Sequence, residues 1–363
     1  MKIAIVHDVL VEFGGAERVL QSLLRLYPKA HVYTSYKDDA MVEARFPLLS
    51  KTNLFCSPFQ RVPAAQHAYL FQFLAPLVWR RLHLEQYDVV ISSSAYLLSN
   101  IIEVEHPVHI QYIHGLPKNL FHLGPKTQIQ MILPLSPMLA RLYKKSLRKY
   151  KNIIVCSKHI QQSLGNVCGV SSEVIYPPVI IPAQYHQTRQ GLYYVIISRI
   201  DASKEIEIAI HACNVLRVRL KIAGVSIDVQ YERYLRHIAG PTIEFLGFQD
   251  DAQQLELYRH AIALLFTARS EDFGITPVEA MAHGVPVIAY CGGGVKETVI
   301  DKKTGVFYSE HSVAALVTVL ETFNPKRFNP IFIRRHAEHY SEANFHKHMG
   351  LYIQNALLNR KNR

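Results

Sequence analysis

Residues 263–289, ALLFTARSEDFGITPVEAMAHGVPVIA, contain the pattern that decides the fold. An apolar strand ends at Thr267, a polar loop containing Gly274 follows, and a second apolar strand begins at Pro286. Pro277 falls where the intervening helix would begin, and proline is well tolerated in the first turn of a helix. Short apolar strands separated by a helix are typical of a parallel sheet with helices on both faces.

The same alternation of strands and helices extends along the whole chain. The first half predicts strands at 2–7, 30–35, 88–93, 108–113 and 152–156, and helices near 15–26, 66–83, 134–149 and 157–165. The second half predicts strands at 192–198, 218–223, 242–246, 262–266, 286–290 and 305–308, and helices near 203–216, 228–238, 251–260, 276–283 and 311–322. We therefore expect an α/β protein built on parallel sheets.

A domain boundary is predicted near residues 177–190, where three prolines and a polar stretch precede a fresh strand. We expect two doubly wound, Rossmann-like domains facing each other across a cleft, at residues 1–185 and 186–339. A C-terminal helix near residues 340–363 is expected to pack back on the first domain. Such sheets bind ligands beyond the carboxyl ends of their strands, so the cleft is the default site.

The composition excludes several classes of protein. Of 363 residues, 49% are hydrophobic and 19% are charged, which argues against global disorder. No apolar run approaches the ~20 residues of a membrane-spanning helix, and residues 1–8 predict a buried strand rather than a signal peptide. The five cysteines include no C-x-x-C pair, which argues against a disulfide scaffold or a thiolate zinc site. This usage fits a reducing cytoplasm.

Positive charge is concentrated in the first half of the chain. The net charge is +11, and residues 51–200 hold 15 basic and 5 acidic residues. The helix predicted near 134–149 is basic and amphipathic. Its sequence combines the apolar residues Leu135, Met138, Leu139, Leu142 and Tyr143 with the basic run Arg141, Lys144, Lys145, Arg148, Lys149 and Lys151. Together with the apolar stretch at 67–82, this helix suits peripheral contact with an anionic membrane surface. A solvated helix face above ordinary core packing explains it equally well. Nucleic acid is the rival partner of a basic protein, but no nucleic-acid-binding motif supports it.

Two segments have features of an anion site. Gly14 and Gly15 lie between a strand and a helix, where glycine allows close backbone approach and the helix offers free N–H groups. An ordinary tight turn explains these glycines equally well. Arg199 ends the first strand of the second half, and Lys204 opens the next helix. Two cations at that edge could clamp a diphosphate, although unrelated surface cations are the commoner explanation of such a pair.

The third segment is residues 271–289. Glu271 falls in the loop and Glu279 in the first turns of the helix, so both could face one ligand and accept hydrogen bonds from the hydroxyls of its two sugar rings. The N–H groups after Phe273 could meet phosphate. The alternative is a helix N-terminus carrying acidic residues for its dipole.

The motif that contains Glu271 and Glu279 resembles the signature of retaining family 4 glycosyltransferases of the GT-B fold. The Arg199/Lys204 pair and the loop Gly14-Gly15-Ala16-Glu17 resemble the other two hallmarks of that family, in the expected order. The resemblance covers nearly the whole chain and points to bacterial mannosyltransferases that build surface polysaccharides.

The resemblance implies a role for each matching residue. Glu271 would bind hydroxyls of the donor sugar, Glu279 the ribose, and Arg199 and Lys204 the diphosphate leaving group. Backbone groups near Phe273, Gly274 and Ile275 would seat the donor, and Gly14 and Gly15 would approach its phosphates. His114 would contact the transferred sugar. Glu271, His114, Arg199 and Lys204 form the implied catalytic set. The segment Cys291-Gly292-Gly293-Gly294 also resembles the family, and a tight turn explains it equally well.

The implied reaction is transfer of a hexose, with retention of configuration, from a sugar nucleotide to a glycan or lipid-linked hydroxyl. GDP-mannose is the implied donor. A UDP-sugar donor, a GT-B sugar-nucleotide epimerase and a non-catalytic binding protein are the alternatives. The chain contains no Asp-x-Asp motif, so no metal or other cofactor is expected. Many family members have glycine directly after the lysine, whereas Glu205 follows Lys204 here, which leaves the local turn geometry open.

Overall fold

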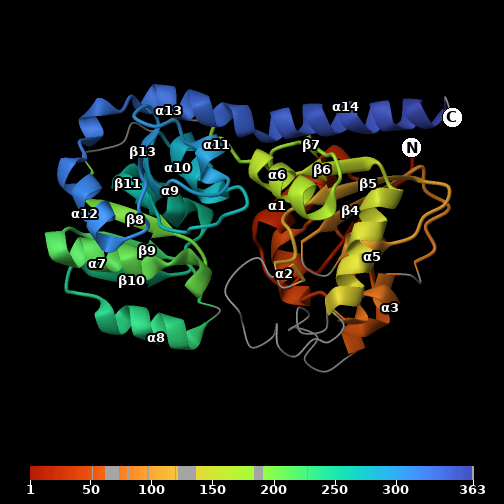
Figure 1. Cartoon of the computed structure of the whole chain (residues 1–363), viewed down its shortest axis with the longest axis horizontal. Coiled ribbons are helices and arrows are strands. Elements are labelled where there is room, and N and C mark those ends of the chain that lie inside the picture. The colour runs from red at the N-terminus through yellow and green to blue at the C-terminus, as the bar shows by residue number, and fades with distance from the viewer. Residues whose placement is uncertain are drawn as a thin grey trace. The chain divides into compact units, whose positions relative to one another are not determined.

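The computed structural model describes residues 1–50, 52–61, 73–79, 82–95, 98–118, 120–121, 136–183, 191–226 and 228–361. The chain divides into two compact units (Figure 1). Unit 1 comprises Met1–Pro178 and Ala343–Arg363, and unit 2 comprises Val179–Glu342. The chain thus leaves unit 1 directly after the proline pair that ends at Pro178, and it returns at Ala343.

Unit 1 is built on a seven-stranded parallel sheet with the strand order β3-β2-β1-β4-β5-β6-β7. Its strands are β1 (Ile3–His7), β2 (His31–Thr34), β3 (Leu54–Cys56), β4 (Val89–Ser94), β5 (Val108–Ile113), β6 (Asn152–Val155) and β7 (Glu173–Val174). The strand order reverses direction between β1 and β4, so right-handed crossovers place the earlier and later helices on opposite faces. The carboxyl ends of β1, β4 and β5 therefore meet at one edge of the sheet.

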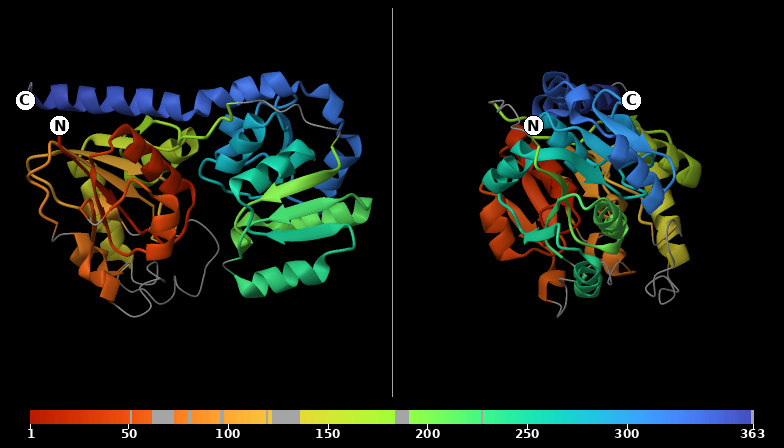
Figure 2. Two further views of the ribbon diagram at one scale, coloured as in Figure 1. Left: turned by 180° about the vertical axis from the view of Figure 1, so that it is seen from behind. Right: turned by 90° about the vertical axis from the view of Figure 1, so that its left-hand side faces the viewer.

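The helices of unit 1 cover both faces of this sheet (Figures 1 and 2). They are α1 (Gly15–Leu26), α2 (Asp39–Arg45), α3 (Ala75–Trp79), α5 (Ser136–Lys149), α6 (Lys158–Cys168) and α14 (Glu342–Lys361), with short 3-10 turns η1 (Pro58–Arg61) and η3 (Ser99–Ile101). The long C-terminal helix α14 packs on this unit. His346 Nε2 lies 2.9 Å from Ser22 Oγ of α1, and the Phe345 ring lies 6.2 Å from the ring of Tyr112.

Unit 2 is built on a six-stranded parallel sheet with the order β10-β9-β8-β11-β12-β13. Its strands are β8 (Tyr193–Ile197), β9 (Leu220–Ala223), β10 (Ile243–Gly247), β11 (Ala261–Phe266), β12 (Val287–Tyr290) and β13 (Gly305–Tyr308). Its helices are α7 (Ile206–Leu216), α8 (Val229–Ile238), α9 (Asp251–Arg259), α10 (Ile275–Ala282), α11 (Val295–Thr298), α12 (Val313–Thr322) and α13 (Pro330–Ala337), with 3-10 turns η4 (Ala202–Lys204), η5 (Pro325–Arg327) and η6 (Glu338–Tyr340). The prediction of two parallel-sheet, Rossmann-like α/β domains is confirmed.

The predicted helix at 66–83 is described only in part. Residues 62–72, 80 and 81 lie outside the described residues, and α3 is the helical part that the structure describes there. Within it Trp79 is 1% exposed and belongs to the core, whereas Leu77 is 63% exposed. The apolar character of residues 75–79 is therefore partly explained by core packing. Among the described residues no helix is long and apolar enough to cross a membrane.

Candidate functional site

Arg199 and Lys204 lie beyond the carboxyl end of β8, on the turn that leads into α7. Asp201 caps the intervening 3-10 turn, because its Oδ1 accepts a 2.9 Å hydrogen bond from Ser203 N. Its Oδ2 lies 3.8 Å from Arg199 Nε. The Arg199 side chain remains 48% exposed, so its guanidinium can reach a bound anion at this edge of the sheet.

Glu271 lies in the loop after β11, beside Lys204. The strands that precede these two loops, β8 and β11, are neighbours in the sheet. Lys204 Nζ lies 2.6 Å from Glu271 Oε2, with the side chains 16% and 26% exposed. Thr267 Oγ1 donates a 2.8 Å hydrogen bond to Lys204 O, which ties the two loops together. The structure thus brings together two of the predicted site residues as a partly buried ion pair.

The N-terminus of α10 follows Glu271 directly. Gly274, the N-cap residue, has φ +85°, a conformation that glycine adopts without a steric penalty. Phe273 is buried and its ring packs 5.6 Å from the ring of Tyr340, so its side chain anchors the loop in the protein. Ile275 opens the helix, and Glu279 is partly exposed one turn later. The amides of the first helical turn have no acceptor within the helix, which makes this end of α10 suited to an anion.

The backbone of the glycine segment 292–294 packs directly against the backbone of the Glu271 loop. Gly294 N donates a 2.8 Å hydrogen bond to Glu271 O. A Cβ atom added to Gly294 would lie 2.5 Å from Asp272 O, and one added to Gly293 would lie 2.5 Å from Glu271 O. The segment is therefore more than a tight turn before a helix. Because its glycines have no side chains, its backbone can contact the backbone of the Glu271 loop, and this contact holds Glu271 in position.

In unit 1, Gly14 and Gly15 lie where β1 leads into α1. Gly14 is the N-cap residue and Gly15 the first residue of the helix. The buried Glu17 folds back over this turn and accepts a 2.9 Å hydrogen bond from Gly14 N. Glu17 therefore shapes the glycine loop from inside the protein.

His114 directly follows β5 at the carboxyl edge of the same sheet. Its backbone N donates to Ser94 O at 2.9 Å, and its Nε2 lies 2.8 Å from Ser93 Oγ. Burial of the ring, reinforced by the neighbouring His7, lowers the pKa of His114 to about 3. The imidazole is therefore neutral at physiological pH, and it is suited to a hydrogen bond with an uncharged group such as a hydroxyl.

Sequence reasoning missed three buried polar residues at this edge: His7, Asp8 and Ser93. The Asp8 carboxylate accepts hydrogen bonds of 2.8 Å from Ala95 N and 2.9 Å from Ser99 N, which holds the loop after β4. The signal that could have found the first two is the polar pair His7-Asp8 at the end of an otherwise apolar strand.

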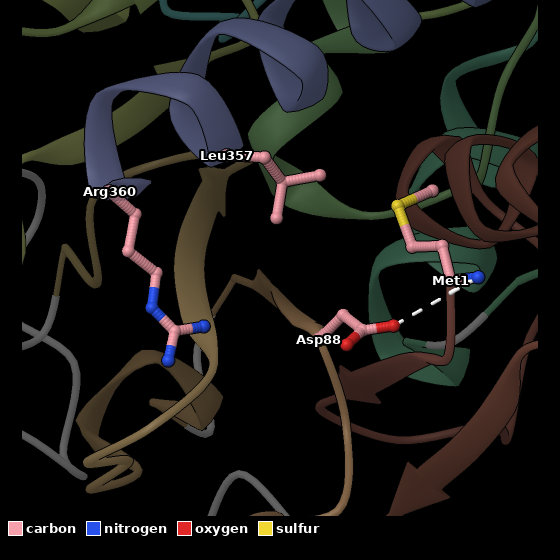
Figure 3. A pocket seen from close by; sticks show the side chains of 4 residues that line it. All are labelled: Met1, Asp88, Leu357 and Arg360. Carbon is pink, nitrogen blue, oxygen red and sulfur yellow. Dashed lines mark ion pairs between the residues drawn. The ribbon is translucent and has the colours of Figure 1, made fainter. Parts of the chain in front are cut away.

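The pocket drawn in Figure 3 lies elsewhere on unit 1. It has a volume of about 440 Å³ and is lined by Met1, Asp88, Leu357 and Arg360. The N-terminal ammonium lies 3.9 Å from Asp88 Oδ2, and Asp88 immediately precedes β4. The pocket is therefore at the amino ends of β1 and β4, the edge of a parallel sheet at which ligands are not expected.

A metal centre would need several ligating side chains in one place. Within the described ranges, no group of three or more His, Cys, Asp or Glu residues is placed to hold a metal ion. The expectation that a diphosphate is held here without a metal stays a prediction.

Two family models match the chain in succession. Residues 13–181 match the model described as glycosyltransferase family 4, and residues 182–327 match the model described as glycosyl transferases group 1. Together with the two parallel-sheet units, these matches define the class: the chain belongs to the family 4 glycosyltransferases, and its fold is GT-B.

Individual relatives are similar over part of their length. The α-1,3/1,6-mannosyltransferase alg-2 of Neurospora crassa is 42% identical over 168 residues, which cover 37% of this chain and 36% of the relative. The enzyme ALG2 of Dictyostelium discoideum is 25% identical over 226 residues, covering 54% and 53%. The chain thus spans about half or less of the length of these curated relatives. The crystal structure of Anabaena HepE in complex with UDP matches 98% of this chain and 100% of its own, with a TM-score of 0.75 and 17% identity.

Proposed function

We propose that this protein is a glycosyltransferase that moves a hexosyl group from a sugar nucleotide to a hydroxyl of a glycan or lipid-linked acceptor. The observation that carries the proposal is the 2.6 Å contact between Lys204 Nζ and Glu271 Oε2, beside the N-terminus of α10. A cation, a carboxylate and free helix amides at one sheet edge are the groups that a sugar diphosphate needs.

The ion pair gives each of these two charges a partner within the protein. Without donor, Lys204 and Glu271 neutralise each other in a partly buried place. In the proposal the donor gives both charges of the ion pair a new partner at the same time. Its diphosphate binds Lys204 and Arg199, and hydroxyls of its sugar donate hydrogen bonds to Glu271. Neither charge is then left buried without a partner, which would be costly.

The chemical step breaks the bond between the anomeric carbon and the diphosphate oxygen. The electron pair of that bond goes to the leaving diphosphate while the acceptor oxygen bonds to the anomeric carbon. Arg199, Lys204 and the first-turn amides of α10 stabilise the negative charge that develops on the diphosphate. We assign Glu279 to the ribose, the backbone at Phe273, Gly274 and Ile275 to seating the donor, and Gly14, Gly15 and His114 to further substrate contacts from unit 1. We propose front-face attack with retention, in which the leaving phosphate takes the proton of the acceptor hydroxyl.

For the donor we propose GDP-mannose. The support is the mannosyltransferase activity named for both curated relatives. A UDP-sugar is the second candidate, and it is favoured by the UDP bound to Anabaena HepE, whose structure matches nearly the whole chain. A nucleotide-binding measurement separates the two candidates.

Glu271→Ala tests the site. The substitution removes the carboxylate that is proposed to hold the donor sugar, so we expect transfer to fall by a factor of 100 or more, on the order of the loss of a charged transition-state contact. Sugar release from radiolabelled GDP-mannose, with and without a lipid-linked acceptor, measures this. Glu256→Ala is the matched control, because Glu256 pairs only with its own helix neighbours Arg259 and His260 in the described part of unit 2. Near wild-type transfer by Glu271→Ala would show that the site is assigned wrongly.

A further inference from the structure

Four polar side chains form a continuous chain of hydrogen bonds inside unit 1. The Glu17 carboxylate Oε1 lies 3.3 Å from His7 Nε2, His7 Nδ1 lies 2.9 Å from Ser93 Oγ, and Ser93 Oγ lies 2.8 Å from His114 Nε2. Glu17, His7 and Ser93 are 7%, 1% and 0% exposed, whereas His114 is partly exposed. Only the last member of this chain can meet a ligand.

The sheet register explains why these side chains meet. His7 pairs with Ser93 across β1 and β4, and Ser93 pairs with Tyr112 across β4 and β5. His114 lies two residues beyond Tyr112, just after the end of β5. Glu17 enters from the first turn of α1, where it also accepts the hydrogen bond from Gly14 N. The chain thus runs from the glycine loop across three neighbouring strands to His114.

The protons of this chain have only one arrangement when both histidines are neutral. A carboxylate only accepts hydrogen bonds, so His7 donates to Glu17 from Nε2 and its Nδ1 must accept. The single hydroxyl proton of Ser93 is then donated to His7 Nδ1, and Ser93 Oγ accepts from His114 Nε2. His114 Nδ1 therefore carries a lone pair, and no described residue forms a hydrogen bond with that atom.

We propose that Glu17, His7 and Ser93 are positioning residues that hold His114 in the Nε2–H tautomer and present Nδ1 as a hydrogen-bond acceptor for a hydroxyl of the sugar substrate. The role in sugar binding rests on the proposed function, whereas the tautomer is a property of the protein alone. A protonated His7 would still donate to Glu17 from Nε2, but it would also donate to Ser93 from Nδ1. Ser93 would then donate to His114 Nε2 and His114 Nδ1 would carry the proton, so the tautomer decides between the two arrangements.

Ser93→Ala breaks the chain at its centre, and Ser92→Ala is its matched control. Ser92 is the adjacent residue of β4, is equally buried, and its Oγ lies 2.9 Å from the Nε2 of a different histidine, His109. Both variants lose one buried hydroxyl that contacts a histidine, so a general effect on stability is shared. Only Ser93→Ala affects the hydrogen bond to His114.

The first readout is the tautomer of His114, measured by long-range proton–nitrogen NMR of protein labelled with 15N-histidine and assigned with His114→Gln. We expect the Nε2–H form in the wild type and in Ser92→Ala, and a mixture of tautomers in Ser93→Ala. A wild-type protein with the Nδ1–H form, or a Ser93→Ala protein with an unchanged tautomer, would overturn the proposal. This readout needs no substrate, so it stands apart from any failure of the proposed function.

The second readout is steady-state transfer. We expect Ser93→Ala to lower kcat roughly tenfold, with KM for the donor within twofold of wild type. The reason is that the His114 imidazole stays in place, but its proton is no longer held on Nε2. Ser93→Thr retains the hydroxyl and should recover part of that loss. If the tautomer changes in Ser93→Ala while kcat stays at the wild-type value, the positioning role is wrong.

Discussion

At the scale of single residues, Glu205 is the departure from the family pattern that the structure explains. It follows Lys204 with φ +49°, a left-handed conformation that costs a non-glycine residue about 1 kcal/mol. Its Oε2 accepts a 2.9 Å hydrogen bond from Arg269 N and lies 3.2 Å from His311 Nε2. The carboxylate therefore joins the Lys204 turn to two other loops, and these contacts offset the backbone strain.

This balance predicts an order of stability for two substitutions. Glu205→Ala loses the carboxylate contacts and keeps the strain, whereas Glu205→Gly loses the same contacts and relieves the strain. We expect Glu205→Ala to be less stable than Glu205→Gly by about 1 kcal/mol in urea unfolding. Equal stability of the two variants would show that the left-handed backbone at this position carries no cost.

At the scale of elements, the contact between the glycine segment 292–294 and the Glu271 loop should be sensitive to a single methyl group. Gly294 has φ −69°, so alanine is compatible with its backbone conformation. The close approach to the backbone of Asp272 and Phe273, with Asp272 O at 2.5 Å and Phe273 Cα at 2.6 Å from an added Cβ, opposes the substitution. We expect Gly294→Ala to lower the free energy of unfolding by about 1–3 kcal/mol, as overpacking does. Nucleotide binding should weaken as the loop is displaced.

Gly350→Ala is the control for this experiment. Gly350 lies within α14, and a Cβ atom there meets nothing within 4 Å. Alanine should therefore stabilise the helix by about 0.5–1 kcal/mol, and nucleotide binding should be unchanged. If Gly294→Ala behaves like Gly350→Ala in both measurements, the glycine segment is only a turn.

The sequence predicts the elements whose residues are buried on all sides. Strands such as β1 (IAIVH) and β11 (AIALLF) are apolar over nearly their whole length, and Pro277 lies two residues after the first residue of α10. The sequence does not predict the strands β3 and β7, because they are only three and two residues long and are not fully buried. Helices α2 and α13 were also not predicted.

The candidate site also has a part that the sequence predicts and a part that only the structure shows. Lys204 and Glu271 are recognised from motifs that occupy one segment each, and the structure adds their contact. The chain from Glu17 to His114 depends on the register of three strands that are far apart in sequence. A single sequence contains the residues of that chain but not the register, so the connection from His7 through Ser93 to His114 is known only from the sheet.

At the scale of the whole molecule, the excess of positive charge is carried in part by one face of α5. This helix buries Leu139, Tyr143, Ser146 and Leu147, and it exposes Arg141, Lys145, Arg148 and Lys149. Met138 is 47% exposed beside them. From this face we propose that α5 contacts an anionic membrane surface, where each basic residue contributes about 1 kcal/mol.

Vesicle sedimentation tests this contact. We expect the wild-type protein to bind vesicles that contain anionic lipid and to be released by salt, and the double variant Arg141→Glu/Lys145→Glu to bind at least tenfold more weakly. Lys326→Glu/Arg327→Glu makes the same change of charge at exposed positions of unit 2 and should bind as the wild type does. Equal losses in the two variants would mean that net charge, and not α5, causes binding.

The central claim is that Arg199 and Lys204 hold the diphosphate of a sugar nucleotide beside Glu271, and binding of nucleoside diphosphates tests it most directly. The measurement is the thermal unfolding midpoint of wild-type and Arg199→Ala protein with GDP, UDP, ADP, dTDP and CMP. A ligand that binds the folded state raises the midpoint. We predict a rise with GDP that Arg199→Ala loses, whereas a rise with UDP alone would keep the site and replace the donor. No shift with any of the five nucleotides would contradict the account.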